Sequence, residues 1–78
     1  MVEVFKTTVS DAYYAKLLLQ KIHQQFPGYR ANFDLTDCDR ILRIETFARL
    51  DPDQILFIIR SFGYQAEILS DEVLSKNA

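Results

Sequence analysis

Between residues 10 and 28, apolar side chains recur at helical spacing on one narrow stripe, and this pattern constrains the fold more than any other feature. A helix with a single apolar stripe has to bury that stripe against another layer of structure. Ser10 is the predicted N-cap, and Asp11 lies in the first turn, where the helix dipole favours an anion. Pro27-Gly28 ends the helix. The stripe consists of Ala15, Leu18, Leu19, Ile22 and Phe26.

A second amphipathic segment begins at Asp51-Pro52-Asp53-Gln54. Asp51 is expected to cap this helix, Pro52 suits its first position, and Gln54 sits where the partner of a capping box lies. Gly63 supplies the left-handed residue that ends the helix. The predicted buried stripe consists of Ile55, Ile58, Ile59 and Phe62.

Four further segments are rich in β-branched and aromatic residues or alternate between apolar and polar residues, which predicts strands. They cover residues 2–8, 29–35, 41–47 and 64–69, and a polar turn at 36–39 makes a hairpin of the second and third. The order is then β-α-β-β-α-β, and both single-striped helices are expected to cover one face of a four-stranded sheet. With right-handed crossovers, this is a ferredoxin-like α+β sandwich with antiparallel strand order 4-1-3-2.

The composition narrows the class of protein. The formal net charge of −2 lacks the basic excess that a nucleic-acid binder needs. Cys38 is the one cysteine, so an internal disulfide is impossible and a reducing compartment such as the cytoplasm is expected. Neither a signal sequence nor a membrane span is indicated. Residues 1–70 are predicted to form one domain with a frayed tail at 71–78, as a complete protein or as one module of a longer chain.

The second half of the chain resembles the heavy-metal-associated domain of copper chaperones and metal-transporting ATPases. Residues 51–69, DPDQILFIIRSFGYQAEIL, match that family's acidic-Pro helix start, Ile-rich helix and Gly-aromatic-x-Ala entry into the last strand. The first half matches by spacing. The family's Met-x-Cys-x-x-Cys loop then falls with Val9 at the methionine and with Asp11 and Tyr14 at the two cysteines.

The resemblance spans residues 2–69 and implies a ferredoxin-like fold, but it does not extend to the chemistry of the metal loop. Monovalent copper prefers thiolate ligands, and Asp11 and Tyr14 supply none. We therefore expect no metal at this loop and no cofactor. His23 and Cys38 are weak metal candidates elsewhere, because nothing in their spacing brings them together. Asp37-Cys38-Asp39 is interpreted as a polar hairpin turn rather than a cation loop.

An enzyme is not expected. The sequence contains no nucleophile elbow, no phosphate-binding glycine loop and no pair of carboxylates in a catalytic pattern. Acylphosphatases have this topology, but they use an arginine in the first loop, and this loop has none. RNA-recognition domains also share it, but residues 40–47, RILRIETF, lack the glycine and the internal aromatics of their motif.

Large apolar residues predicted to lie outside the two core stripes remain, and they suggest a contact surface. They are Tyr13, Tyr14 and Leu17 on the first helix and Phe57 on the second. The sequence thus favours a non-catalytic module that binds an unknown protein partner or forms a homodimer. One alternative is a metal-handling protein that uses Asp11, His23 or Cys38. A second alternative is a dimeric small-ligand sensor.

Overall fold

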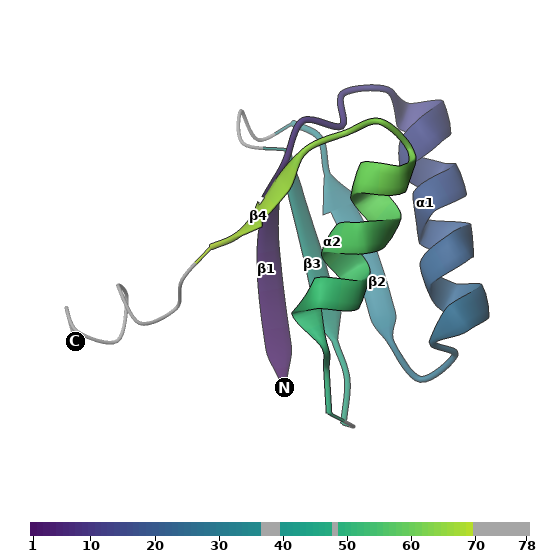
Figure 1. Cartoon of the computed structure of the whole chain (residues 1–78), viewed down its shortest axis with the longest axis vertical. Helices are drawn as coiled ribbons and strands as arrows, with labels where there is room; N and C mark the ends of the chain where they lie inside the picture. Colours follow the sequence, from purple (N-terminus) through teal and green to yellow (C-terminus); the bar gives the residue numbers. More distant parts are fainter. Residues whose placement is uncertain (37–39, 48, 70–78) are drawn as a thin grey trace, which may run out of the picture.

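In the computed structural model, described for residues 1–36, 40–47 and 49–69, the elements follow the predicted order. Two helices cover one face of a four-stranded antiparallel sheet, in which the strands lie in the order β2-β3-β1-β4 (Figure 1). The predicted ferredoxin-like arrangement is confirmed, because 4-1-3-2 is this order written from the opposite edge. The elements are β1 (Val2–Thr7), α1 (Ala12–Gln25), β2 (Arg30–Asp34), β3 (Ile41–Glu45), α2 (Pro52–Ser61) and β4 (Ala66–Ile68).

The strand register places the alternating apolar residues in rows beneath the helices. Leu42 of β3 lies opposite both Phe33 of β2 and Phe5 of β1, and Phe5 lies opposite Ile68 of β4. Phe5 and Leu42 are fully buried, so the centre of this row is the floor of the core. The helices close the core from above with their predicted stripes, to which α2 adds the buried Leu56. A one-residue slip of the register would turn this row towards solvent.

The start of α1 differs from the prediction. Asp11, not Ser10, is the N-cap: its backbone is extended, and its carboxylate accepts a 2.7 Å hydrogen bond from the Tyr13 N–H. The carboxylate thus satisfies one of the N–H groups that have no partner inside the helix. The C-cap is Phe26, directly before the predicted stop at Pro27-Gly28.

The boundaries of α2 follow its sequence signals closely. The Asp51 carboxylate accepts from the Asp53 N–H at 3.1 Å, and the Gln54 side-chain amide donates to that carboxylate at 3.4 Å. In a capping box, the Gln54 side chain would accept a hydrogen bond from the Asp51 backbone N–H. Here it donates to the Asp51 carboxylate instead and so holds the capping side chain in place. At the other end, Gly63 adopts φ +91°, and its N–H donates to the Arg60 carbonyl.

All four strands are shorter than predicted, and β2 contains only Arg30–Asp34. β1 stops at Thr7, β3 at Glu45, and β4 contains only Ala66–Ile68. The last difference arises because the Tyr64 N–H donates to the Ile59 carbonyl and so belongs to the Schellman cap of α2. The predicted turn residues 37–39 and tail residues 71–78 lie outside the described residues. Within the described parts of the chain, no helix is both long and apolar enough to cross a membrane.

Candidate functional site

The loop between β1 and α1 is held in place by two threonines. The buried Thr7 hydroxyl donates to the Arg40 carbonyl at 2.7 Å and accepts from the Val9 N–H at 3.1 Å. Thr8 forms backbone and side-chain hydrogen bonds with Gln65, which ties the loop to the segment that follows α2. Val9 is fully buried in the core. These hydrogen bonds therefore fix the position of the loop from which the first turn of α1 begins.

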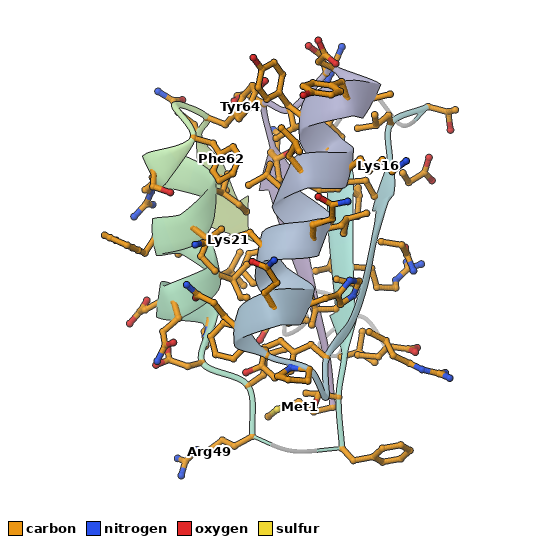
Figure 2. The ribbon with its side chains drawn as sticks, turned by 90° about the vertical axis from the view of Figure 1, so that its right-hand side faces the viewer. Met1, Lys16, Lys21, Arg49, Phe62 and Tyr64 are labelled. Atoms are coloured by element: carbon orange, nitrogen blue, oxygen red, sulfur yellow. The ribbon has the colours of Figure 1, made fainter. Side chains whose placement is uncertain are left out.

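Three tyrosines gather at this end of the molecule. The Tyr13 and Tyr14 rings meet edge to face, with centroids 5.2 Å apart and an interplanar angle of 79°. Tyr14 in turn meets Tyr64 at 6.3 Å and 60°. Figure 2 shows Tyr64 at the level of the first turn of α1. These three residues, called the tyrosine cluster from here on, join the start of α1 to the end of α2.

The tyrosine cluster combines exposure with order. Tyr13 is 64% exposed and Tyr14 43% exposed, whereas Tyr64 is half-buried against the core. Edge-to-face ring pairs add about 0.5–1.5 kcal/mol beyond the area that they bury, which favours one arrangement of the rings. Sequence reasoning missed Tyr64 because it assigned the residue to a strand. The Gly63 signal at the end of the helix was the available clue, since a Schellman turn brings the next residue back over the helix end.

The other two predicted contact residues lie differently. Leu17, one turn after Tyr13 on α1, is half-buried rather than fully exposed. Phe57 is 72% exposed and projects from α2. Within the described residues, no ring contact joins Phe57 to the tyrosine cluster. The structure therefore brings together Tyr13, Tyr14 and Tyr64, and it leaves Phe57 as a separate exposed side chain.

The metal candidates are not brought together by the described part of the structure. The Asp11 carboxylate caps α1, and His23 lies near the far end of the same helix, about 18 Å further along its axis. His23 Nε2 accepts a 3.3 Å hydrogen bond from the Ala31 N–H. Cys38 lies outside the described residues. Among residues 1–36, 40–47 and 49–69, no group of three or more His, Cys, Asp and Glu residues is arranged to hold a metal ion.

Both edges of the sheet are contacted by a helix side chain. On the β2 edge, His23 of α1 binds the backbone of Ala31, as described above. On the β4 edge, an Arg60 guanidinium nitrogen of α2 donates to the Ala66 carbonyl at 3.4 Å. Unpaired backbone groups at an edge are where another chain's strand can add. On each edge, a helix side chain thus satisfies one backbone group of the edge strand.

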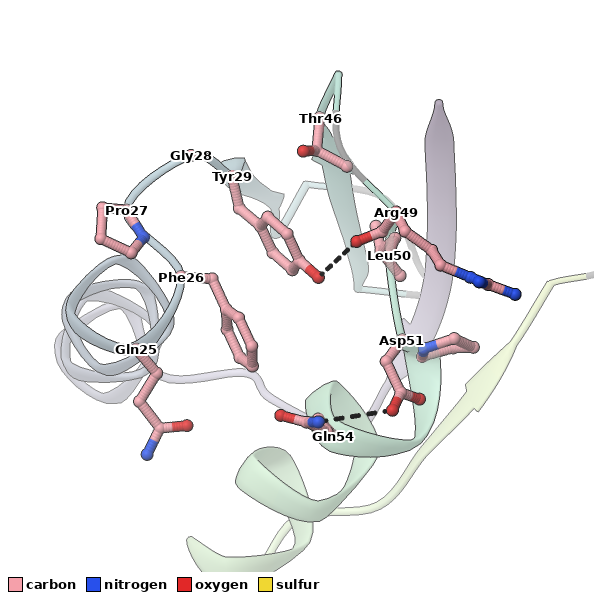
Figure 3. A pocket seen from close by; sticks show the side chains of 11 residues that line it. Gln25, Phe26, Pro27, Gly28, Tyr29, Thr46, Arg49, Leu50, Asp51 and Gln54 are labelled. Atoms are coloured by element: carbon pink, nitrogen blue, oxygen red, sulfur yellow. Dashed lines mark hydrogen bonds between the residues drawn. The ribbon is translucent and has the colours of Figure 1, made fainter.

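At the opposite end of the molecule, an open pocket of about 780 Å³ lies between the segment that ends α1 and the segment that leads into α2 (Figure 3). The Phe26 and Tyr29 rings stack at 4.6 Å and 11°, and the Tyr29 hydroxyl donates to the Arg49 carbonyl at 3.3 Å. Leu50 is buried beside them. No local sequence pattern indicates this pocket, because its walls come from two segments that are separated along the chain by β2 and β3.

Comparison of the chain with protein-family models, with curated proteins and with solved structures found no match.

Proposed function

We propose that this chain is a non-catalytic protein-interaction module, with a fold like that of the heavy-metal-associated family, that binds its partner through the start of α1. The observation that carries the proposal is the tyrosine cluster. Two of its rings are exposed to solvent on a surface whose base is fixed by hydrogen bonds of Thr7 and Thr8. Tyr14, which the sequence resemblance sets at a metal-binding cysteine of the heavy-metal-associated family, belongs to this aromatic surface.

The physical chemistry of tyrosine supports this use. A tyrosine side chain offers a large apolar ring and a hydroxyl, yet it has only two torsions to fix on binding. Tyrosine is accordingly enriched among the residues that contribute most to binding at protein interfaces. Rings that are already ordered by mutual contact lose less conformational freedom when a partner covers them. The cluster thus resembles a preorganised anchor more than a set of scattered apolar side chains.

Site-specific photo-crosslinking in the source cells tests the proposal. A photoreactive phenylalanine analogue is placed at Tyr13 and, in a second variant, at Leu17, which lies one turn away on α1. The control carries it at Asn32, an exposed position on β2. We expect an adduct of one discrete size from both α1 positions and none from Asn32. Adducts of the same size and yield from all three positions, or none from α1, would contradict the proposal.

The metal-handling alternative is tested on the full chain under reducing conditions. Cu(I) and Zn(II) are titrated separately, with bound metal measured by native mass spectrometry and competition with a chelator. Stoichiometric binding at sub-micromolar affinity, lost in either Cys38→Ser or His23→Ala, would establish that alternative and displace the interaction module. On the proposed function, neither metal binds stoichiometrically at that affinity.

The pocket beside Phe26 and Tyr29 favours small-ligand binding as a second candidate function, because its volume falls in the range of ligand sites. A thermal-shift screen of metabolites tests it, since a ligand that binds only the folded chain raises its melting temperature. A true pocket ligand loses its effect in Gly28→Phe, where a side chain starts in open space at the pocket wall. Compounds that stabilise both forms equally would eliminate the pocket as their site.

A further inference from the structure

The outer face of α1 has the spacing of a helix-pairing seam. Counted from Tyr13, positions separated by four, three and four residues lie on one stripe, opposite the buried Ala15, Leu18 and Ile22. Leu17 is half-buried and the other seam residues are exposed. The seam is apolar in its first half and ends in uncharged amides. Its members are Tyr13, Leu17, Gln20 and Gln24.

Lysines flank this seam on both sides. Figure 2 shows Lys16 on the side of α1 that faces β2 and Lys21 on the side that faces α2. In a paired helix these are the flanking positions whose charges select the partner. Both side chains are exposed, and within residues 1–36, 40–47 and 49–69 neither takes part in an ion pair or hydrogen bond.

The lysines give α1 a charge opposite to that of the whole chain. The helix contains two of the nine Lys and Arg residues and none of the eleven Asp and Glu residues, although the chain has a formal net charge of −2. Asp11, just before the helix, uses its carboxylate to cap the Tyr13 N–H. The exposed seam is therefore bordered by positive charge without a balancing carboxylate on the same helix.

This arrangement disfavours a second copy of the chain as the occupant. In a parallel pair of α1 helices, the flanking position of Lys16 faces the flanking position of Lys21 in the other copy. In an antiparallel pair, each flanking position faces the equivalent position of the other copy, so Lys16 faces Lys16 and Lys21 faces Lys21. Like charges meet in both orientations, and such repulsion discriminates against a partner.

We infer that the outer face of α1 docks an amphipathic helix of another protein whose apolar stripe is bordered on both sides by carboxylates. The inference rests on the proposed function and specifies the chemistry of its partner. An apolar side chain of the partner packs against Tyr13 and Leu17, and polar side chains lie against Gln20 and Gln24. Carboxylates beside the stripe meet Lys16 and Lys21, which fixes the register and speeds association at low salt.

Two synthetic peptides of roughly five helical turns serve as probes for the full-length chain. They share one apolar stripe, which is flanked by glutamates in the acidic peptide and by lysines in the basic peptide. Affinity is measured by fluorescence anisotropy at low and high salt, and the binding face is mapped from backbone amide NMR signals. We expect the acidic peptide to bind roughly tenfold or more tightly than the basic one, to lose affinity with salt and to shift α1 signals.

Charge reversal provides the matched control. The Lys16→Glu/Lys21→Glu variant is expected to prefer the basic peptide. The Arg30→Glu/Arg43→Glu variant changes the net charge equally but on the exposed sheet face, and it is expected to keep the preference for the acidic peptide. Circular dichroism confirms that both variants are folded. An identical response of the two variants would overturn the inference, because only net charge would then matter.

The remaining outcomes separate this inference from the function on which it rests. Equal affinity for both peptides, or NMR shifts outside α1, overturns the acidic-helix inference. A dimer of the unmodified chain that forms through α1 overturns it in favour of a second copy. If neither peptide binds but Tyr13 still gives the discrete crosslink, the partner chemistry is wrong and the interaction module stands. If the crosslink is absent as well, both fail.

Discussion

The two ends of the molecule both carry paired aromatic rings, but they use them in opposite ways. At the end where β1 leads into α1, Tyr13 and Tyr14 meet edge to face in contact with solvent. At the other end, Phe26 and Tyr29 stack face to face, and Tyr29 is only 8% exposed. Burial rather than ring contact supplies most of the free energy of such pairs. The second pair should therefore stabilise the fold, while the first remains available for a partner.

The largest expected effect on stability is at the buried pair. Tyr29→Ala should lower the free energy of unfolding by about 3 kcal/mol, because it removes a buried ring and leaves a cavity beside Phe26. Tyr29→Phe keeps the ring and removes only the hydrogen bond to the Arg49 carbonyl, so about 1 kcal/mol is expected. Urea unfolding measures both. A loss in Tyr29→Ala no greater than in Tyr29→Phe would show that the ring is not a core residue.

Thr7 tests whether the exposed end depends on buried hydrogen bonds. Thr7→Val keeps the shape of the side chain but leaves the Val9 N–H without its acceptor and the Arg40 carbonyl without this donor, at about 2 kcal/mol. Urea unfolding and amide hydrogen exchange at Val9 measure the effect. Thr8→Val is the comparison on the exposed side of the loop, and a smaller loss is expected there. If Thr8→Val costs more, the loop is held chiefly from the Gln65 side.

Two glycines, one at each end of the molecule, distinguish the cost of a strained backbone from the cost of a steric clash. At Gly63, φ is +91°, so Gly63→Ala should destabilise the chain by about 1 kcal/mol and shift Tyr64 relative to Tyr14. Gly28 has no such positive φ, and an added methyl group meets open space at both positions. Gly28→Ala should therefore leave stability unchanged or slightly raised. Thermal unfolding measures the stability of both variants. Equal losses of stability would contradict the assignment of backbone strain to Gly63.

The smallest expected effect on stability is at the exposed ring that matters most for binding. Tyr13→Ala should change the free energy of unfolding by less than about 0.5 kcal/mol, because the side chain is largely exposed. The same change should abolish measurable binding of the acidic peptide. Phe57→Ala is the control for an equally exposed aromatic outside the tyrosine cluster, and it should leave both quantities unchanged. A variant at Tyr13 that unfolds easily would place this residue in the core instead.

Much of the fold is predictable from local patterns in the sequence. The bounds and the buried face of α2 are predictable because caps and periodicity act within a few residues. Asp51-Pro52 marks the start of the helix, Gly63 marks its end, and the apolar stripe consists of Ile55, Ile58 and Ile59. The alternation of residues 29–35 likewise identifies β2 and its half-buried face. Given one apolar stripe per helix, the layer arrangement follows, and with the handedness of the crossovers so does the strand order.

Only part of the candidate site could be predicted from the sequence. Tyr13 and Tyr14 are recognisable as large side chains outside the apolar stripe of the first helix, but no pattern identifies the residues that contact them. The choice of Asp11 over Ser10 as the cap depends on the path of the loop, which Thr7 and Thr8 fix through Arg40 and Gln65. The same loop path determines which residues flank the cluster. Sequence spacing carries no information about such contacts, because they join segments more than thirty residues apart.

The sequence by itself thus determined the elements, their order and the apolar stripe of each helix, since all of these are local or periodic. Only the tertiary structure decided that Tyr64 contacts Tyr14, that His23 binds the edge of β2, and that two distant segments line an open pocket beside Tyr29. The physical reason is that packing of the shared core determines which ends of helices and strands lie next to one another. Side chains at those ends meet partners that no local pattern specifies.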